Sequence, residues 1–164
     1  MDKDSVDRMI EAWADADPTL DPRPLEVVGR LLLCAQHCQQ QLVAALRPLD
    51  LSFGDFDVLN TLRRRADPHG TNPSQLAQSS LITTGAMTAR LHRLERSGLI
   101  TRVPDRGDGR AVRIRLTARG SRLARKALQA VLEADEAFLE PLQMQQRDTV
   151  ASILKLLLLH NEAT

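Results

Sequence analysis

The sequence predicts a mainly α-helical protein that carries one short β-hairpin. Apolar residues recur at helical spacing over most of the 164 residues, whereas they alternate with basic residues between positions 99 and 117. Hydrophobic residues make up 43% of the chain and charged residues 26%, which is a globular composition. No apolar run approaches the roughly 20 residues that a membrane helix needs.

The start of the chain and its rare residues exclude several classes of protein. The first residues are acidic and contain no apolar segment of the secretory type, so we expect a cytoplasmic protein that makes no membrane contact. Two cysteines are too few for a disulfide scaffold. With one Trp, three Phe and no Tyr, the chain has too few aromatic rings to stack on single-stranded nucleic acid.

The net charge of +1 hides a strong asymmetry along the chain. Residues 1–26 carry a net charge of −5, whereas residues 83–125 hold eleven arginines and three acids, a net charge of +8. Arginine forms bidentate contacts with phosphate and guanine, so this segment suggests a face that binds a polyanion. A solvated charged surface would have the same composition.

The N-terminal third of the chain predicts three helices. Asp4 and Ser5 can cap a short helix that ends near residues 17 and 18. The proline-rich stretch 17–24 cannot be helical and is predicted to be a linker. A long helix is expected over residues 25–46, closed by Pro48, and a third over residues 53–65.

The middle of the chain predicts two short helices joined by a tight turn. Asn72 and Pro73 open the first, which ends near Gln78. The second is expected from Thr83 or Thr84 to Ser97, where Gly98 provides a left-handed cap. This layout is typical of a helix-turn-helix.

The C-terminal half predicts a hairpin and two further helices. Residues 99–103 and 111–117 alternate apolar and basic side chains around a turn-rich centre, as in a β-hairpin. Thr117 can cap a helix that runs to about Glu140, and residues 145–160 form a final amphipathic helix. The predicted fold is a winged helix-turn-helix, over about residues 53–117, held between terminal helices.

An ordered series of short motifs accompanies this layout. These motifs are Phe56-Asp57-Val58-Leu59, Leu62-Arg63-Arg64, the run 84–95, Ser97-Gly98-Leu99-Ile100, and Asp108-Gly109-Arg110 ahead of Leu116-Thr117. The succession resembles the MarR family of transcriptional regulators over roughly residues 25–160.

The resemblance implies an obligate homodimer with interlocked terminal helices. Residues 1–24 would then be an N-terminal helix and linker, and residues 25–164 a MarR-type domain whose dimerisation helices are 25–46 and 118–160. The family binds double-stranded DNA, with recognition helices in adjacent major grooves of a pseudo-palindromic operator and wings in the minor groove. The implied function is that of a ligand-responsive repressor.

The same resemblance assigns DNA-binding residues. Thr83 and Thr84 at the start of the recognition helix suit phosphate oxygens, and the face next to them could meet base edges. Met87, Leu91 and Leu94 are expected on the inner face. Arg110 matches the family's wing-tip arginine, which Asp108 could hold extended. The full predicted set is Thr83, Thr84, Gly85, Thr88, Ala89, His92, Arg93, Asp108 and Arg110.

A narrower resemblance, to the urate-responsive PecS and HucR group of this family, concerns the effector. Trp13, Asp57 and Arg64 match residues of that group, and Arg90 matches by its position in the recognition helix. Asp57 and Arg64 are two helical turns apart and share a face. An indole, a carboxylate and a guanidinium suit a planar anionic purine such as urate.

Other interpretations of these residues stay open. Trp13 could anchor its helix to the body of the protein, and Asp57 and Arg64 could form a surface ion pair. The effector could equally be a phenolic acid, or the signal could be oxidation. A dimeric adaptor that does not bind DNA remains the alternative from another class.

The remaining polar residues suggest no catalytic or cofactor chemistry. Cys34, His37 and Cys38 lie on one helix face, but three ligands would need a fourth, so we expect packing cysteines and no metal. No Gly-rich phosphate loop, nucleophile elbow or catalytic carboxylate pair appears, so the sequence predicts neither an enzyme nor a bound cofactor.

Overall fold

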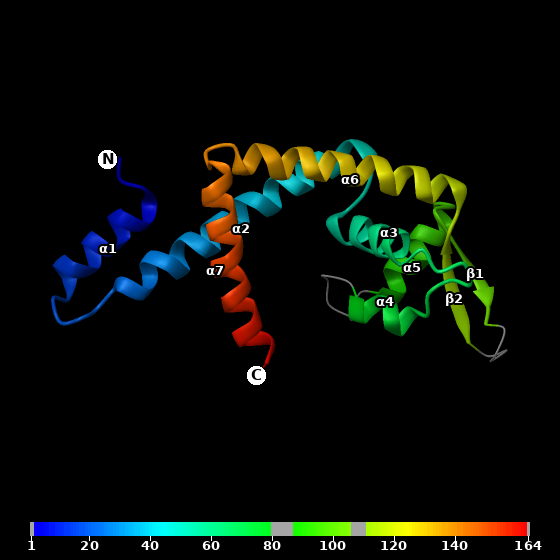
Figure 1. Cartoon of the computed structure of the whole chain (residues 1–164), viewed down its shortest axis with the longest axis horizontal. Helices are drawn as coiled ribbons and strands as arrows, with labels where there is room; N and C mark the ends of the chain where they lie inside the picture. Colours follow the sequence, from blue (N-terminus) through cyan, green and yellow to red (C-terminus); the bar gives the residue numbers. More distant parts are fainter. Residues whose placement is uncertain (1, 80–86, 106–110, 164) are drawn as a thin grey trace. The chain divides into compact units, whose positions relative to one another are not determined.

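The structure is a computed structural model that describes residues 2–79, 87–105 and 111–163. Packing divides the chain into two units, Met1–Gln41 and Leu42–Thr164, and the boundary falls within a helix. Figure 1 shows the elements in chain order, and their bounds follow. They are α1 (Ser5–Ala16), α2 (Arg23–Leu46), the short 3₁₀ helix η1 (Arg47–Leu49), α3 (Phe53–Arg65), α4 (Pro73–Ser79), α5 (Met87–Arg96), β1 (Ile100–Pro104), β2 (Val112–Leu116), α6 (Ala118–Leu139) and α7 (Met144–Glu162).

The first unit is organised around the N-terminus of α1. Asp4 is the N-cap and accepts hydrogen bonds from the N–H groups of Val6 and Asp7, while Asp7 accepts from the Asp4 N–H at 3.0 Å. Arg30 on α2 pairs with both carboxylates. The Asp7 N–H and then the Arg30 guanidinium hold the pKa of Asp4 below its ordinary value. Val6 is buried beside Gly29, whose missing side chain leaves room for it.

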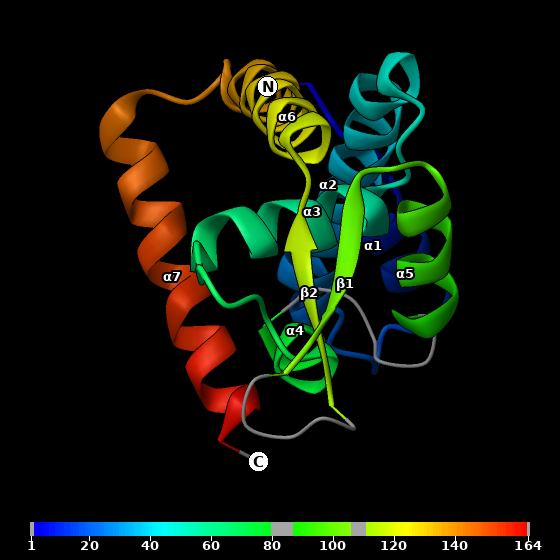
Figure 2. The ribbon, with the colours of Figure 1, turned by 90° about the vertical axis from the view of Figure 1, so that its right-hand side faces the viewer.

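The second unit contains a closed hydrophobic core. Its largest fully buried side chains come from α2, α3, α4, α5 and β2: Leu46, Leu59, Leu76, Leu94 and Ile114. Figure 2 shows the hairpin in front of α3 and beside α5. β1 and β2 are antiparallel with Ile100 opposite Leu116, and Thr71 adds an isolated bridge to Ile114. The core therefore joins the helices to the wing.

The corner between α5, the hairpin and α6 is fixed by short contacts. Gly98 ends α5 with φ of 64°, a left-handed conformation that favours glycine. Thr117 caps α6 by accepting from the Gly120 N–H and also donates to the Gly98 carbonyl at 2.8 Å. A Cβ on Gly120 would lie 1.9 Å from the Leu99 carbonyl oxygen, so only glycine allows this approach.

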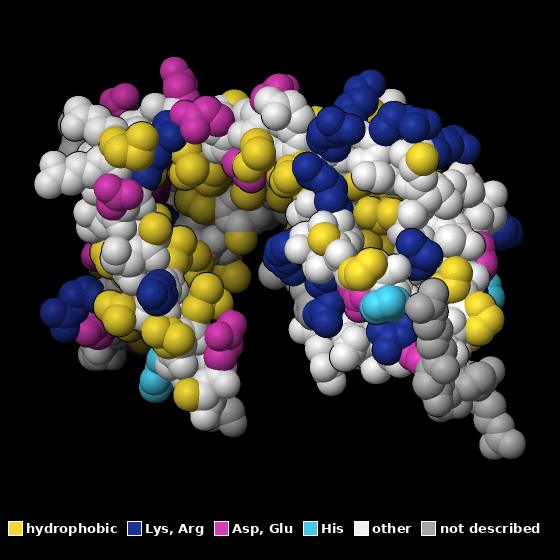
Figure 3. Space-filling view, turned by 45° about the vertical axis from the view of Figure 1, so that its right-hand side comes forward, with side chains coloured by type: hydrophobic (Ala, Val, Ile, Leu, Met, Phe, Trp, Pro, Cys, Tyr) yellow, Lys and Arg dark blue, Asp and Glu magenta, His cyan; other side chains and the backbone are white. Residues whose placement is uncertain are grey.

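The helix α7 and much of α2 expose apolar side chains. No residue of α7 is buried, and Leu156 is 69% exposed. Figure 3 shows such apolar side chains on the surface of α7. Arg147 fixes the turn from α6 by pairing with Glu136 at 2.8 Å and donating to the Leu139 and Leu142 carbonyls.

Most predicted element bounds are confirmed, with two corrections. The third helix has its predicted limits, Phe53–Arg65, and Thr117 caps α6 as expected. The linker prediction was wrong at its end, because α2 already begins at Arg23 and takes Pro24 into its first turn, where a missing N–H costs nothing. The last helix is slightly longer than predicted, Met144–Glu162.

Candidate nucleic-acid interface and effector residues

The exposed face of α5 is the centre of the candidate interface. Met87, Leu91 and Leu94 are buried against the core, which confirms their predicted inward orientation. The opposite face exposes Thr88, Ala89 and His92. A helix with a small, polar outer face can approach base edges in a major groove closely.

Arg93, also predicted to bind DNA, has an intramolecular partner. Its guanidinium lies 2.5 Å from Oδ1 of Asp55, in the first turn of α3, although the Arg93 side chain remains 50% exposed. Arg90 on the same helix lies 3.6 Å from that oxygen and packs over Gly54. A Cβ on Gly54 would lie 2.3 Å from Cζ of Arg90, so glycine is needed for this packing.

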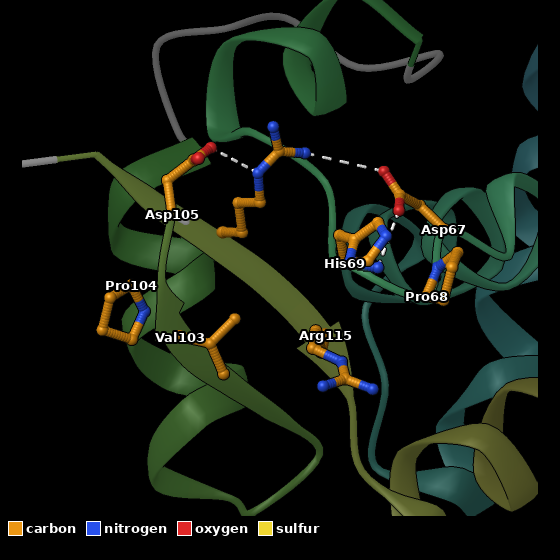
Figure 4. A pocket seen from close by; sticks show the side chains of 8 residues that line it. Asp67, Pro68, His69, Val103, Pro104, Asp105 and Arg115 are labelled. Carbon is orange, nitrogen blue, oxygen red and sulfur yellow. Dashed lines mark hydrogen bonds and ion pairs between the residues drawn. The ribbon is translucent and has the colours of Figure 1, made fainter. Parts of the chain in front are cut away.

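The wing is attached to the helices by ion pairs. Arg102 of β1 pairs with Glu95 of α5 at 2.9 Å. Arg113 of β2 pairs with Asp105, lies 3.6 Å from Asp67 in the α3–α4 loop, and donates to the Gly70 carbonyl at 2.9 Å. Figure 4 shows these two ion pairs of Arg113 as dashed lines in a cavity of about 440 Å³. Each strand of the hairpin thus has an ion pair to a residue outside the hairpin.

Basic side chains remain exposed around these contacts. Arg115 of β2 and Arg96 of α5 are exposed, as are Arg119, Arg122 and Arg125 on α6. Figure 3 shows Lys and Arg side chains gathered over the lobe formed by α3 to β2 and over α6. Such a surface attracts a polyanion over a distance set by the ionic strength.

Five of the predicted DNA-binding residues lie outside the described residues. These are Thr83, Thr84 and Gly85 ahead of α5, and Asp108 and Arg110 between β1 and β2. Their assignment stays a prediction.

The predicted effector residues lie on three helices. Asp57 and Arg64 are both on α3, Asp57 buried and Arg64 exposed, and each has an interaction partner. Arg90 on α5 has a side chain that is only 16% exposed. Trp13 on α1, in the first unit, is 46% exposed. Their assembly into one pocket stays a prediction.

Asp55 and Asp67 are residues that the sequence interpretation missed. Ser52 followed three residues later by Asp55 is a capping-box pattern, which could have placed Asp55 at the start of α3. No local pattern could link Asp55 to Arg93 or Asp67 to Arg113, because these pairs are far apart in sequence.

The cysteines differ from one another in exposure. Cys34 is exposed, contrary to the expectation of packing, and Cys38 is half-buried. Within the described ranges, no group of three His, Cys, Asp or Glu side chains could hold a metal. Nor does any helix there have the length and apolar character to cross a membrane.

Comparison with known proteins places these features in a family. The model of the MarR family matches residues 49–111. The transcriptional regulator PecS of Dickeya dadantii is 32% identical over 149 residues, 91% of this chain and 90% of PecS. A transcriptional repressor of Mycobacterium tuberculosis is 34% identical over 71% of this chain and 82% of its own length.

A solved structure of a relative bound to DNA has the same fold. It is a cysteine-to-serine mutant of the Escherichia coli protein MarR in complex with operator DNA. The superposition has a TM-score of 0.71 at 26% identity and covers 89% of this chain and 97% of that one.

Proposed function

This chain belongs to the MarR family of winged helix-turn-helix transcriptional regulators, and on that premise we propose that it is a homodimeric repressor that releases its operator when a small aromatic anion binds. Family membership makes it a DNA-binding regulator and not an enzyme. The proposal concerns the dimer, the residues that meet DNA, and the effector.

The observation that carries the proposal is the outer face of α5. Thr88, Ala89 and His92 are exposed on a helix whose opposite face is locked into the core. The similarity to a structure bound to operator DNA supports the use of this face in a major groove. Exposed arginines on β2 and α6 supply the sequence-independent attraction to phosphate.

The exposed apolar residues of α2 and α7 support a second copy of the chain as the partner. Val28, Leu31, Ile153, Leu156 and Leu158 are all more than 40% exposed. Exposed apolar residues on helices are typical of the interfaces of obligate dimers. In a two-fold dimer the two α5 helices would meet successive half-sites of a pseudo-palindromic operator.

Asp57, Arg64, Arg90 and Trp13 remain the proposed effector residues. The similarity to PecS over most of both chains supports their transfer from that group. Asp57 is buried on the same helix as exposed Arg64, which offers a carboxylate for ring N–H groups and a cation for an anionic ring. Urate or a related purine is the proposed effector, and a phenolic acid is the alternative for the same residues.

Selection of DNA from a random-sequence duplex library by the purified protein tests the DNA-binding function. We expect enrichment of a pseudo-palindrome whose half-sites are about one helical turn apart. Binding to the selected duplex should weaken steeply as salt rises, because counterions are released from the phosphates. Failure to enrich any sequence would contradict the proposal.

The effector is tested by thermal unfolding with urate, xanthine or salicylate, followed by release of the selected duplex. A ligand that binds only the folded protein raises the unfolding temperature. We expect urate to raise it. Trp13→Phe should weaken this shift without changing DNA affinity in the absence of ligand, and Arg64→Ala should abolish both the shift and DNA release. Arg65→Ala, at the next position of α3, is the matched control and should respond as the wild type does. A normal response by Arg64→Ala would exclude this residue set.

A further inference from the structure

Asp55 uses its two carboxylate oxygens for two different tasks. Oδ2 accepts hydrogen bonds from the N–H and O–H groups of Ser52, at 3.2 and 2.6 Å, and so completes the cap of α3. Oδ1 faces α5, where Arg93 lies 2.5 Å away and Arg90 3.6 Å away. The Asp55 side chain is only 6% exposed. A cap at the start of α3 would require the first task alone.

We propose that Asp55 is a positioning residue for DNA binding, which fixes the rotation of α5 about its own axis through Arg93 and Arg90. In this proposal the guanidinium of Arg93 pairs with Asp55 and does not neutralise a DNA phosphate. Arg93 is then not a DNA-contacting residue, contrary to the prediction from sequence. This inference rests on the proposed DNA-binding function and concerns which groups make that function possible.

Rotation of α5 matters because its outer face is narrow. Thr88, Ala89 and His92 are small or medium-sized, so they reach base edges only if the helix is presented at the right angle. The buried face of α5 consists of flexible aliphatic side chains, Met87, Leu91 and Leu94, which tolerate small rotations. The hydrogen bond that Arg93 donates to Oδ1 of Asp55 is directional and fixes what the apolar packing leaves free. Arg90, 3.6 Å from the same oxygen, adds a second positive charge but no hydrogen bond.

The burial of Asp55 makes the pairing obligatory. A carboxylate that is removed from water must be hydrogen-bonded and paired, or it is strongly destabilised. Ser52 supplies two hydrogen bonds but no charge, and Arg90 and Arg93 are the cations placed against Oδ1. Gly54 permits the approach of Arg90, since any Cβ there would overlap its guanidinium.

The first experiment separates the cap from the charge. Asp55→Asn keeps an amide oxygen that can accept from Ser52 but removes the charge that holds Arg93, whereas Ser52→Ala removes part of the cap and keeps the charge. We expect Asp55→Asn to bind the selected duplex about tenfold or more weakly and Ser52→Ala to bind it as the wild type does. Equal losses in the two variants would overturn the proposal.

The second experiment uses the salt dependence of binding. Arg93→Gln is the variant because Gln keeps a donor for Asp55 and Arg90 remains as a cation beside it. Each phosphate contact contributes about 0.9 to the slope of log K against log salt, so a symmetric dimer would lose about 1.8 if Arg93 touched phosphate. We expect weaker binding with an unchanged slope. A slope reduced by that amount, or an unchanged affinity, would overturn the proposal.

The third experiment needs no DNA. Hydrogen exchange of the α5 amides of Leu91 and Leu94 should accelerate in Asp55→Asn and in Arg93→Gln, and the double variant should be no faster than either single variant. Unchanged exchange would overturn the proposal. If the wild type selects no DNA, the proposed function fails; if it does and these variants match it, only the role of Asp55 fails.

Discussion

The lobe from α3 to β2 and the helix α7 belong to the same compact unit but bury their apolar residues in opposite ways. The lobe encloses Leu59, Leu76 and Ile114 completely within one chain. The helix α7 buries none of its residues, although it is richer in leucine. The core of the lobe is therefore completed within one chain, with Leu46 of α2 and Ala124 of α6, whereas the apolar face of α7 depends on the proposed dimer to be covered.

The largest effect is expected where this dependence is broken. Ile153→Asp combined with Leu157→Asp places two charges on one face of α7. If that face is buried in a dimer, each charge should cost about 2–4 kcal/mol of association free energy, and DNA affinity should collapse with the dimer. Sedimentation equilibrium measures the mass. Gln145→Asp, on the polar first turn of α7, is the control. A dimeric double variant would show that this face is not the interface.

The second largest effect is expected when leucine is replaced by alanine, once in the core of the lobe and once on α7. Leu59→Ala removes a fully buried side chain and should cost about 2–5 kcal/mol of unfolding free energy at every protein concentration. Leu156→Ala should cost less, and its cost should depend on protein concentration because it acts through association. Urea unfolding at two concentrations a hundredfold apart distinguishes them. A concentration-dependent cost for Leu59→Ala would contradict a core completed within one chain.

A smaller effect is expected near the turn of the hairpin, where ion pairs supplement the apolar attachment of the wing through Ile100 and Ile114. Arg113→Ala leaves Asp105 and Asp67 without the cation they share and should cost about 1–3 kcal/mol of unfolding free energy. Arg115→Ala, at an exposed position on the same strand, is the control and should change stability by less than about 0.5 kcal/mol. Equal costs would mean that the ion pairs of Arg113 do not hold the wing.

The smallest effect is expected in the first unit and depends on pH. Arg23 lowers the pKa of Asp21 to about 2, so the ionised carboxylate stabilises the folded state. A lowered pKa gives stability that is present above the ordinary value near 4 and is lost as the pH falls toward 2. Both groups are exposed, so the loss should be slight. Circular dichroism between pH 5 and 2 measures it, and Asp21→Asn should lack that component.

Local signals allowed most of the fold to be predicted. Asp4 and Thr117 each cap the helix that follows, and Gly98 ends α5, because these residues act within one turn of their own position. The apolar spacing of α5 likewise gave the correct inner face. The error at Arg23 arose because proline in a first turn looks the same in sequence as proline in a linker.

The contacts of the site were less accessible from sequence. Asp55 and Arg93 are 38 residues apart, and no periodicity connects them. The apolar pattern of α7 also resembles that of a core helix, since an interface and a core require the same spacing. Only the folded chain distinguishes Leu59, which is buried, from Leu156, which is exposed.

The single tryptophan on α1 gives the protein a simple optical property. The chain contains one Trp and no Tyr, so nearly all of its near-ultraviolet absorbance and intrinsic emission arises from Trp13. The indole is 46% exposed, so its emission maximum and its quenching by iodide report on the surroundings of α1. Circular dichroism reports on all of the helices, so the two signals together compare the surroundings of α1 with the helical structure of the whole chain.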